Sequence, residues 1–213
     1  MPRLLERRAA SPFLKPCAEY NRRAFLESME RRERVSPGKP LILDSCCGNG
    51  ASAVALAEAF PEHYVIGVDK SAARLAKHPR RLMPNLDLVR ADLADYWRLM
   101  HGAGVRLARH YLLYPNPWPK IGQLSRRWHA HPVFPSLLEL GGRLECRSNW
   151  RIYIEEFCFS IRHLTGIDAR CETWRPDAAQ TPFEKKYLES DHELFRAVVG
   201  LRYQESDVRN QIS

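Results

Sequence analysis

The sequence has no uninterrupted apolar run that approaches the roughly 20 residues of a membrane-spanning helix. The residues after Met1 also lack the apolar core of a secretory signal peptide. The opening is rich in arginine, as in a transit peptide, but Glu6 and the charged stretch that follows are atypical of one. We therefore expect a cytoplasmic protein without a membrane partner.

Paired cysteines at metal-ligand spacing are also missing. The six cysteines include no Cys-x-x-Cys pair, and the adjacent Cys46 and Cys47 are poorly placed to chelate one metal ion together. Among the histidines, His129 and His131 come nearest to a ligand pair, and we expect both at the surface or in a loop. The sequence predicts reduced thiols in a cytosolic core and no metal.

Acidic residues are outnumbered. The 213 residues hold 33 lysines and arginines against 25 aspartates and glutamates, a formal net charge of +8. This excess favours polyanionic partners such as tRNA or another RNA. The length and the 45% of hydrophobic residues suit one compact globular unit, and both a monomer and a homodimer are compatible with them.

The basic excess is concentrated in residues 1–39, where ten lysines and arginines face five glutamates. We expect a basic, mainly helical extension here, followed by the main domain over residues 40–213. The apolar stripe of this N-terminal extension would be formed by Ala24, Phe25, Leu26 and Met29. Charge pairs four residues apart, Glu27 with Arg31 and Glu30 with Arg34, would support the helix, although the same surface could meet RNA.

After a break at residues 36–40, short apolar runs alternate with helix-like stretches. Helices are expected at about 51–60 and from about 71. Strands are expected at residues 41–44, 64–68, 86–89, 110–114, 143–147, 169–174 and 194–203. This alternation predicts an α/β fold with a doubly wound, mostly parallel, Rossmann-like sheet and helices on both faces.

The informative side chains follow three successive strands. Asp44, Asp69 and Asp92 close the first, second and third strands. In an open parallel sheet, ligands bind where the carboxyl ends of the strands meet the following loops. A carboxylate at the second strand end can accept both ribose hydroxyls of an adenosine, and one at the third can meet its adenine amino group.

The turn after the first strand contains Cys46, Gly48 and Gly50. Glycines in such a turn let the backbone approach a ligand and present N–H groups to it. A dinucleotide fold is the near rival, but Cys46 stands where the Gly-x-Gly-x-x-Gly pattern requires its first glycine, and the last glycine is absent. The turn therefore favours S-adenosylmethionine over a nicotinamide cofactor.

The second half of the chain contains more specific motifs. Tyr-Leu-Leu-Tyr-Pro-Asn-Pro-Trp-Pro-Lys at residues 111–120 is followed by Arg126-Arg127 and by His-Pro-Val-Phe at 131–134. Arg-Ser-Asn-Trp occupies 147–150, and Thr-Pro-Phe-Glu-Lys-Lys-Tyr-Leu occupies 181–188. In this order the motifs resemble those of the bacterial tRNA (guanine-N7) methyltransferases, over roughly residues 41–199.

The resemblance implies a class I S-adenosylmethionine-dependent methyltransferase that modifies N7 of a guanosine in tRNA. Thr181 and Glu184 would fix the methionine end of the donor or the guanine, and Lys120, Arg126 and Arg127 would contact the tRNA backbone. Residues implied in donor binding are Asp44, Cys46, Gly48, Gly50, Asp69, Lys70, Asp92, Leu93 and Asn116. Asn116 and Asn149 would be the catalytic positions, and Trp118 with Asn149 would contact the base.

This chain departs from the family pattern at two acidic positions, at Cys46, which replaces a glycine, and in one basic run. Asn116 and Asn149 stand where the family has acids, and a basic run between Lys120 and Arg126 is replaced by neutral residues. Guanine N7 has a lone pair and no proton, so its methylation needs positioning and no general base. Asparagine pairs well with an adenine edge. Two alternatives therefore stay open: a methyltransferase for another RNA base or a small molecule, and a non-catalytic RNA-binding relative.

Overall fold

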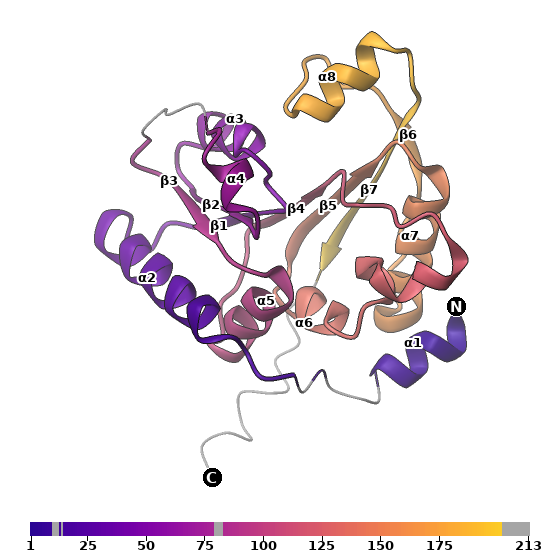
Figure 1. The fold of residues 1–213 in the computed structure, drawn as a ribbon, viewed down its shortest axis with the longest axis horizontal. Helices are drawn as coiled ribbons and strands as arrows, with labels where there is room; N and C mark the ends of the chain where they lie inside the picture. The colour runs from indigo at the N-terminus through magenta and orange to yellow at the C-terminus, as the bar shows by residue number, and fades with distance from the viewer. Residues whose placement is uncertain (10–12, 14, 79–82, 202–213) are drawn as a thin grey trace.

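A computed structural model describes residues 1–9, 13, 15–78 and 83–201 of the chain, and its centre is a seven-stranded sheet (Figure 1). The strand order is β3-β2-β1-β4-β5-β7-β6. The strands are β1 (Leu41–Ser45), β2 (Tyr64–Asp69), β3 (Leu86–Arg90), β4 (Arg109–Leu113), β5 (Gly142–Ser148), β6 (Glu172–Trp174) and β7 (Leu194–Leu201). The predicted doubly wound α/β fold is confirmed.

The first five strands are parallel, and β7 runs antiparallel to both β5 and β6. Strand β1 is central: Leu43 lies opposite Ile66 of β2 on one side and His110 of β4 on the other. The strand order reverses between β1 and β4. Because ligands of open parallel sheets bind at such a reversal, this point is where a site is expected.

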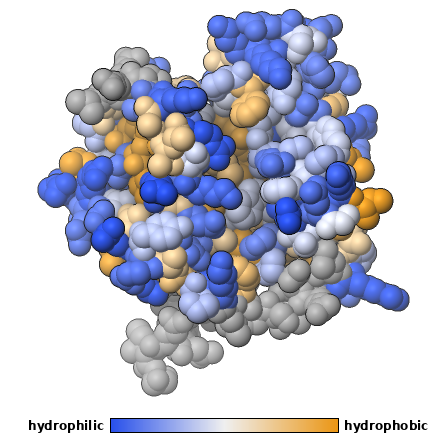
Figure 2. All heavy atoms as spheres, in the orientation of Figure 1, coloured by the Kyte–Doolittle hydropathy of each residue, from blue (hydrophilic) through white to orange (hydrophobic). Residues whose placement is uncertain are grey.

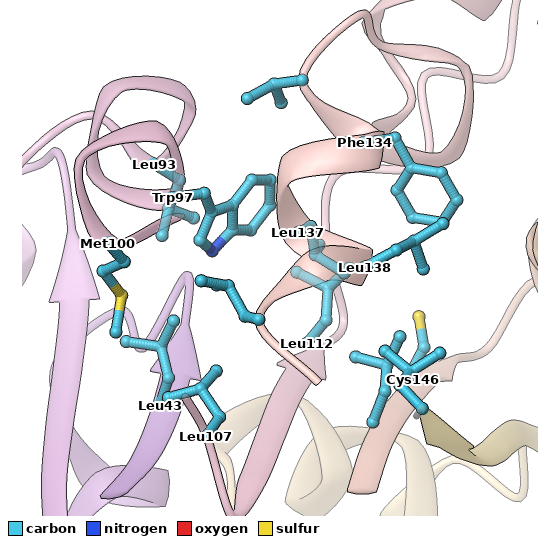
Figure 3. Packing of buried hydrophobic residues seen from close by; sticks show 14 of the residues in the cluster. Leu43, Leu93, Trp97, Met100, Leu107, Leu112, Phe134, Leu137, Leu138 and Cys146 are labelled. Carbon is cyan, nitrogen blue, oxygen red and sulfur yellow. The ribbon is translucent and has the colours of Figure 1, made fainter. Parts of the chain in front are cut away.

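Helices cover both faces of the sheet (Figure 1). They are α1 (Pro2–Ala9), α2 (Glu19–Val35), α3 (Ala51–Ala59), α4 (Ala72–Leu75), α5 (Leu93–Gly102), α6 (Phe134–Glu139), α7 (Arg151–Thr165) and α8 (Pro182–Glu189), with 3-10 turns η1 (Ile121–Arg126) and η2 (Trp128–Ala130). Helix α3 packs on one face through Ala53 and Leu56. Helices α5, α6 and α7 pack on the other, where Trp97 lies between α5 and α6 (Figure 3).

Helix α2 belongs to the same core as the sheet. Its Phe25 is buried in the main hydrophobic cluster, and Ser28 shares a hydrogen bond of 2.7 Å with Tyr96 of α5. The predicted apolar stripe is wrong at Leu26, which is 52% exposed. Helix α2 therefore shares its core with the sheet and with α5.

The predicted charge pairs of α2 also differ. Glu27 pairs with Arg23, at 3.8 Å, and Arg31 reaches across to Asp87 of β3, at 2.5 Å. Asp87 is almost fully buried, so the guanidinium of Arg31 compensates a carboxylate that burial would otherwise destabilise.

Other boundaries differ slightly from the predicted ones. The helix after β2 is a single short turn, α4, and the strand expected at 169–174 begins only at Glu172. The last predicted strand residues, 202–203, lie outside the described part of the chain. Within the described residues, no helix combines the length and the apolar character needed to cross a membrane.

Candidate active site

A cleft of about 940 Å³ opens at the carboxyl ends of the parallel strands. In Figure 2 it is the apolar hollow between the side of the molecule formed by α3 and α4 and the side formed by α8. Of the residues expected at a site from sequence, those that line the cleft are Cys46, Gly48, Lys70, Asp92, Asn116, Trp118, Arg126, Asn149 and Thr181. Those behind or beside it are Asp44, Gly50, Asp69, Leu93, Lys120, Arg127 and Glu184.

The turn after β1 forms one wall with an unusual backbone. Gly48 and Gly50 adopt positive φ angles of 62° and 81°, and Cys46 does so at 64° despite its side chain. A Cβ atom on Gly50 would lie 2.8 Å from Leu88 Cδ1, the end of a side chain that can shift, so the positive φ angle is the main reason for glycine there. The amide of Cys47 donates to the carbonyl of Val68 at 3.1 Å, which ties this turn to β2.

Asp44 lies beneath the cleft and not on its surface. Its carboxylate is fully buried and accepts a hydrogen bond of 2.5 Å from Ser52, whose side chain does line the cleft. Burial raises the pKa of Asp44 to about 7. The expectation of direct donor contact by Asp44 is therefore corrected: it orients Ser52 at the start of α3.

Asp69 is enclosed by three donors. Its Oδ2 accepts from the amide of Gly48 at 3.0 Å, and its Oδ1 accepts from the amide of Ser71 at 2.8 Å. The guanidinium of Arg74 lies 3.0 Å from the same Oδ1, and Asp69 is only 2% exposed. The side chain that faces the cleft at this place is Arg74.

Asp92 lies on the cleft wall and caps α5. Its Oδ1 accepts from the amide of Ala94 at 2.9 Å, and its own amide donates to Asn21 of α2 at 2.9 Å. Leu93 is buried in the main core directly behind it. The position of Asp92 is therefore fixed by two helices, with its carboxyl group at the cleft.

The loop after β4 forms the opposite wall. Asn116 is exposed, and its side-chain oxygen accepts from the amide of Trp118 at 3.2 Å, which closes a tight turn between two prolines. The guanidinium of Arg126 lies 4.9 Å from the centre of the Trp118 ring. Both Trp118 and Asn149 line the cleft near this turn.

Arg127 is structural, which corrects the expectation that it contacts the tRNA backbone. It is 5% exposed and donates to the carbonyl of Trp118 from Nε at 3.2 Å and from Nη2 at 3.1 Å. It also forms an ion pair with Glu156, which is shared with His129 at 3.1 Å. His129 is fully buried in the turn η2, and not at the surface or in a loop as expected; this burial lowers its pKa.

Glu184 is likewise withdrawn from the cleft. It is fully buried, and its Oε1 accepts from Tyr114 at 3.0 Å and from Arg147 at 2.8 Å, while its Oε2 accepts from the amide of Gln180 at 2.7 Å. A direct role with the donor or the guanine is therefore not supported by this arrangement. Thr181 lines the cleft, and its hydroxyl caps α8 by accepting from the amide of Glu184 at 3.0 Å.

Sequence reasoning missed the roles of Arg147 and Tyr114. Arg147 is 5% exposed, binds Glu145 at 2.7 Å as well as Glu184, and lies 4.0 Å from the ring centre of Trp174. The spacing Thr-x-x-Glu at 181–184 is typical of a helix start and could have predicted the cap. No local pattern in the sequence predicts that Glu184 binds Arg147 of β5.

Within the described residues, no three His, Cys, Asp or Glu side chains are grouped to hold a metal ion. The cleft, in contrast, has the size of a small-molecule cofactor site. Its β1 turn exposes backbone at Gly48, and Asp92 offers a carboxyl group at the next strand but one. These features fit an adenosine-bearing donor.

Comparison with known proteins agrees with this geometry. A family model described as "Putative methyltransferase" matches residues 38–197. The chain belongs to this methyltransferase family. The expectation of an S-adenosylmethionine-dependent methyltransferase of the class I fold is thereby confirmed.

Two relatives and one solved structure illustrate the similarity. The chain is 26% identical over 179 residues to the tRNA (guanine-N(7)-)-methyltransferase of Acinetobacter baylyi, covering 77% of this chain and 71% of the relative. It is 27% identical over 188 residues to the enzyme of that name from Treponema pallidum, covering 81% and 74%. A variant of the 16S rRNA (adenine(1408)-N(1))-methyltransferase of Catenulisporales acidiphilia has the same fold, with a TM-score of 0.59, 19% identity and coverage of 84% and 92%.

Proposed function

We propose that this methyltransferase modifies a purine base of RNA, and that N7 of a guanosine in tRNA is its acceptor. The proposal is supported by the similarity to tRNA (guanine-N(7)-)-methyltransferases over most of the chain. The observation that carries it is that three parts of the chain line one cleft: the turn after β1, Thr181, and the loop after β4 that contains Pro117 and Trp118, here called the Pro-Trp loop. The net charge of +8 suits an RNA partner, and the enzyme would work in the cytoplasm.

The donor end of the cleft lies over β1, β2 and β3. There, backbone groups of Cys46, Gly48 and Gly50 would surround the methionine portion, with Lys70 beside them, and Asp69 would accept the ribose hydroxyls. Asp92 would accept from the adenine amino group, with the backbone of Leu93 behind it. When bound, S-adenosylmethionine supplies an electrophilic methyl group on its sulfonium sulfur. Asp44 acts indirectly, by holding Ser52 at the cleft.

The acceptor end lies between the Pro-Trp loop and α8. Trp118 would stack on the base, and Asn116, Asn149 and Thr181 would orient it by hydrogen bonds. Guanine N7 is attacked through a lone pair and loses no proton, so these residues contribute alignment and no proton transfer.

Cations at and beside the cleft would bind the RNA backbone. Lys120 and Arg126 lie exposed on the Pro-Trp loop and the turn after it, where phosphates can reach them. Arg127 would contribute only by holding the Trp118 and Pro119 carbonyls in place.

The test is methyl transfer from tritiated S-adenosylmethionine to bulk tRNA, followed by nucleoside analysis. We expect 7-methylguanosine as the labelled product. Trp118→Ala should lower kcat/KM by roughly 5- to 160-fold, since stacking of one base contributes about 1–3 kcal/mol. Arg170→Ala, a change at an exposed residue that does not line the cleft, should leave kcat/KM within about twofold. Absence of 7-methylguanosine above a no-enzyme control contradicts the proposal.

A second acceptor is favoured by one feature of the site. The carboxylates of Glu184 and Glu156 are engaged by arginines, and the groups that face the acceptor end are the neutral amides of Asn116 and Asn149. Such amides suit an adenine edge. If guanine is the acceptor, Asn116→Asp with Asn149→Asp should raise 7-methylguanosine formation. If adenine is the acceptor, labelled methyladenosine appears with the unmodified chain, and the double variant loses it.

A further inference from the structure

The carboxylate expected to bind the donor ribose is covered by a side chain of the protein itself. Asp69 is 2% exposed, and Arg74 of α4 lies between it and the cleft, with Nη2 3.0 Å from Oδ1. The side chain of Arg74 is 53% exposed, and α4 is only four residues long. The covering group is therefore a flexible side chain on a short turn at the mouth of the cleft.

The carboxylate of Asp69 has too few free acceptor positions to bind the ribose while Arg74 covers it. A carboxylate offers about four lone-pair positions. Those of Asp69 already receive the amides of Gly48 and Ser71 and the guanidinium of Arg74. Two ribose hydroxyls need two acceptor positions, so one of these three donors must leave before the ribose can bind in that way.

Arg74 is the donor that can leave. The amides of Gly48 and Ser71 belong to the two turns that shape the cleft, and moving them would dismantle the wall. The guanidinium of Arg74, in contrast, is half exposed and can move to water or to another anion. The two amides and the incoming ribose hydroxyls would then keep the buried carboxylate of Asp69 hydrogen-bonded. The released guanidinium would stay on the wall of the same cleft that would receive the RNA base.

We propose that Arg74 is a latch that competes with the donor ribose for Asp69 and, once displaced, binds a phosphate of the RNA acceptor. Donor binding then exposes a phosphate site, so donor and RNA bind with positive coupling. Because coupling between two ligands is reciprocal, RNA should tighten donor binding by the same factor. The RNA part of this inference rests on the proposed acceptor, and the competition for Asp69 rests only on the proposed placement of the donor ribose.

The first experiment is calorimetric titration of the full chain with S-adenosylhomocysteine. Arg74→Ala should bind it about 2- to 10-fold more tightly than the natural chain, because an internal competitor is gone. Arg74→Lys keeps the charge but loses the planar fork and should fall between the two. Lys77→Ala is the matched control, because Lys77 is another exposed cation on the cleft wall; it should bind within about twofold of the natural chain.

The second experiment measures tRNA binding with and without saturating S-adenosylhomocysteine. The natural chain should bind tRNA more tightly when S-adenosylhomocysteine is present. The logarithm of its association constant for tRNA should also fall more steeply with the logarithm of the salt concentration, by the amount expected for about one additional phosphate contact. Arg74→Ala should show neither change, while Lys77→Ala should keep both.

The outcomes separate the latch from the proposed function. Weaker or unchanged S-adenosylhomocysteine binding by Arg74→Ala overturns the latch, since it would make Arg74 a donor ligand or a bystander. If that happens while 7-methylguanosine still forms, the proposed function stands. If Arg74→Ala tightens binding and no base is methylated, the competition stands and the proposed function fails.

Discussion

Replacing Arg147 with methionine should destabilise the protein strongly. Arg147 is bound to the buried carboxylates of Glu145 at 2.7 Å and Glu184 at 2.8 Å, and to the side chain of Gln180 at 2.8 Å. Methionine keeps much of the packing on Trp174 but leaves the carboxylates of Glu145 and Glu184 without their cationic partner. Removing one partner of a buried ion pair costs about 3–5 kcal/mol, mainly because the remaining charge is desolvated without compensation.

The free energy of unfolding can be measured by urea denaturation followed by tryptophan fluorescence. With a urea m-value of about 2 kcal/mol/M, the midpoint should fall by roughly 1.5–2.5 M. Arg170→Met is the matched control, because the Arg170–Asp168 pair is exposed on both sides; its loss should stay within about 0.5 kcal/mol.

A double variant tests the cause. Adding Glu184→Gln to Arg147→Met removes one stranded charge and should recover part of the lost stability. A loss below about 1 kcal/mol for Arg147→Met, or no recovery in the double variant, would refute the view that Arg147 compensates these carboxylates and so docks α8 on the sheet.

Three further predictions follow from single contacts. Burial raises the pKa of Asp44 to about 7, above the value of about 3.9 in an unfolded chain. The folded state therefore binds this proton more tightly, and the free energy of unfolding falls as the pH rises from about 4 to about 7. Asp44→Asn lacks this proton. Its free energy of unfolding in urea, minus that of the natural chain, should therefore be about 2–3 kcal/mol larger at pH 8 than at pH 5. Arg127→Ala should lower the free energy of unfolding by about 2–3 kcal/mol in the same measurement, because it leaves carbonyl groups of the Pro-Trp loop unpaired. Arg126→Ala should change that free energy by about 0.5 kcal/mol or less, but it should weaken RNA binding in filter assays. A Cβ atom on Gly142 would lie 2.2 Å from a backbone oxygen, so Gly142→Ala should lose more than about 3 kcal/mol or fail to fold, while Gly122→Ala, with open space around it, should unfold at nearly the natural midpoint.

The succession of strands along the chain could be predicted because each strand has a local signal. Apolar runs such as residues 64–68 are short, β-branched and bounded by turns, which is typical of buried parallel strands. The burial of every residue from Tyr64 to Asp69 agrees with that pattern. The cleft could also be placed, since strand ends and Gly-rich turns meet at a reversal of strand order in any sheet of this type.

The assignment of individual side chains was less predictable, because partners across the fold leave no local trace. Glu184 and Arg147 are 37 positions apart, and only the sheet brings them together. Neighbouring arginines show the same limit: Arg126 is exposed while Arg127 is buried against Glu156, although both follow the same motif. Asp44 has the expected place at a strand end, but Ser52 occupies the cleft surface above it.

The most direct test of the account is a crystal structure of the chain with S-adenosylhomocysteine. We expect the adenosine between the turn after β1 and Asp92, its ribose hydroxyls on Asp69, and Arg74 turned away from that carboxylate. An adenosine bound elsewhere, or in this cleft with Arg74 still on Asp69 and the ribose held by other groups, would contradict the account.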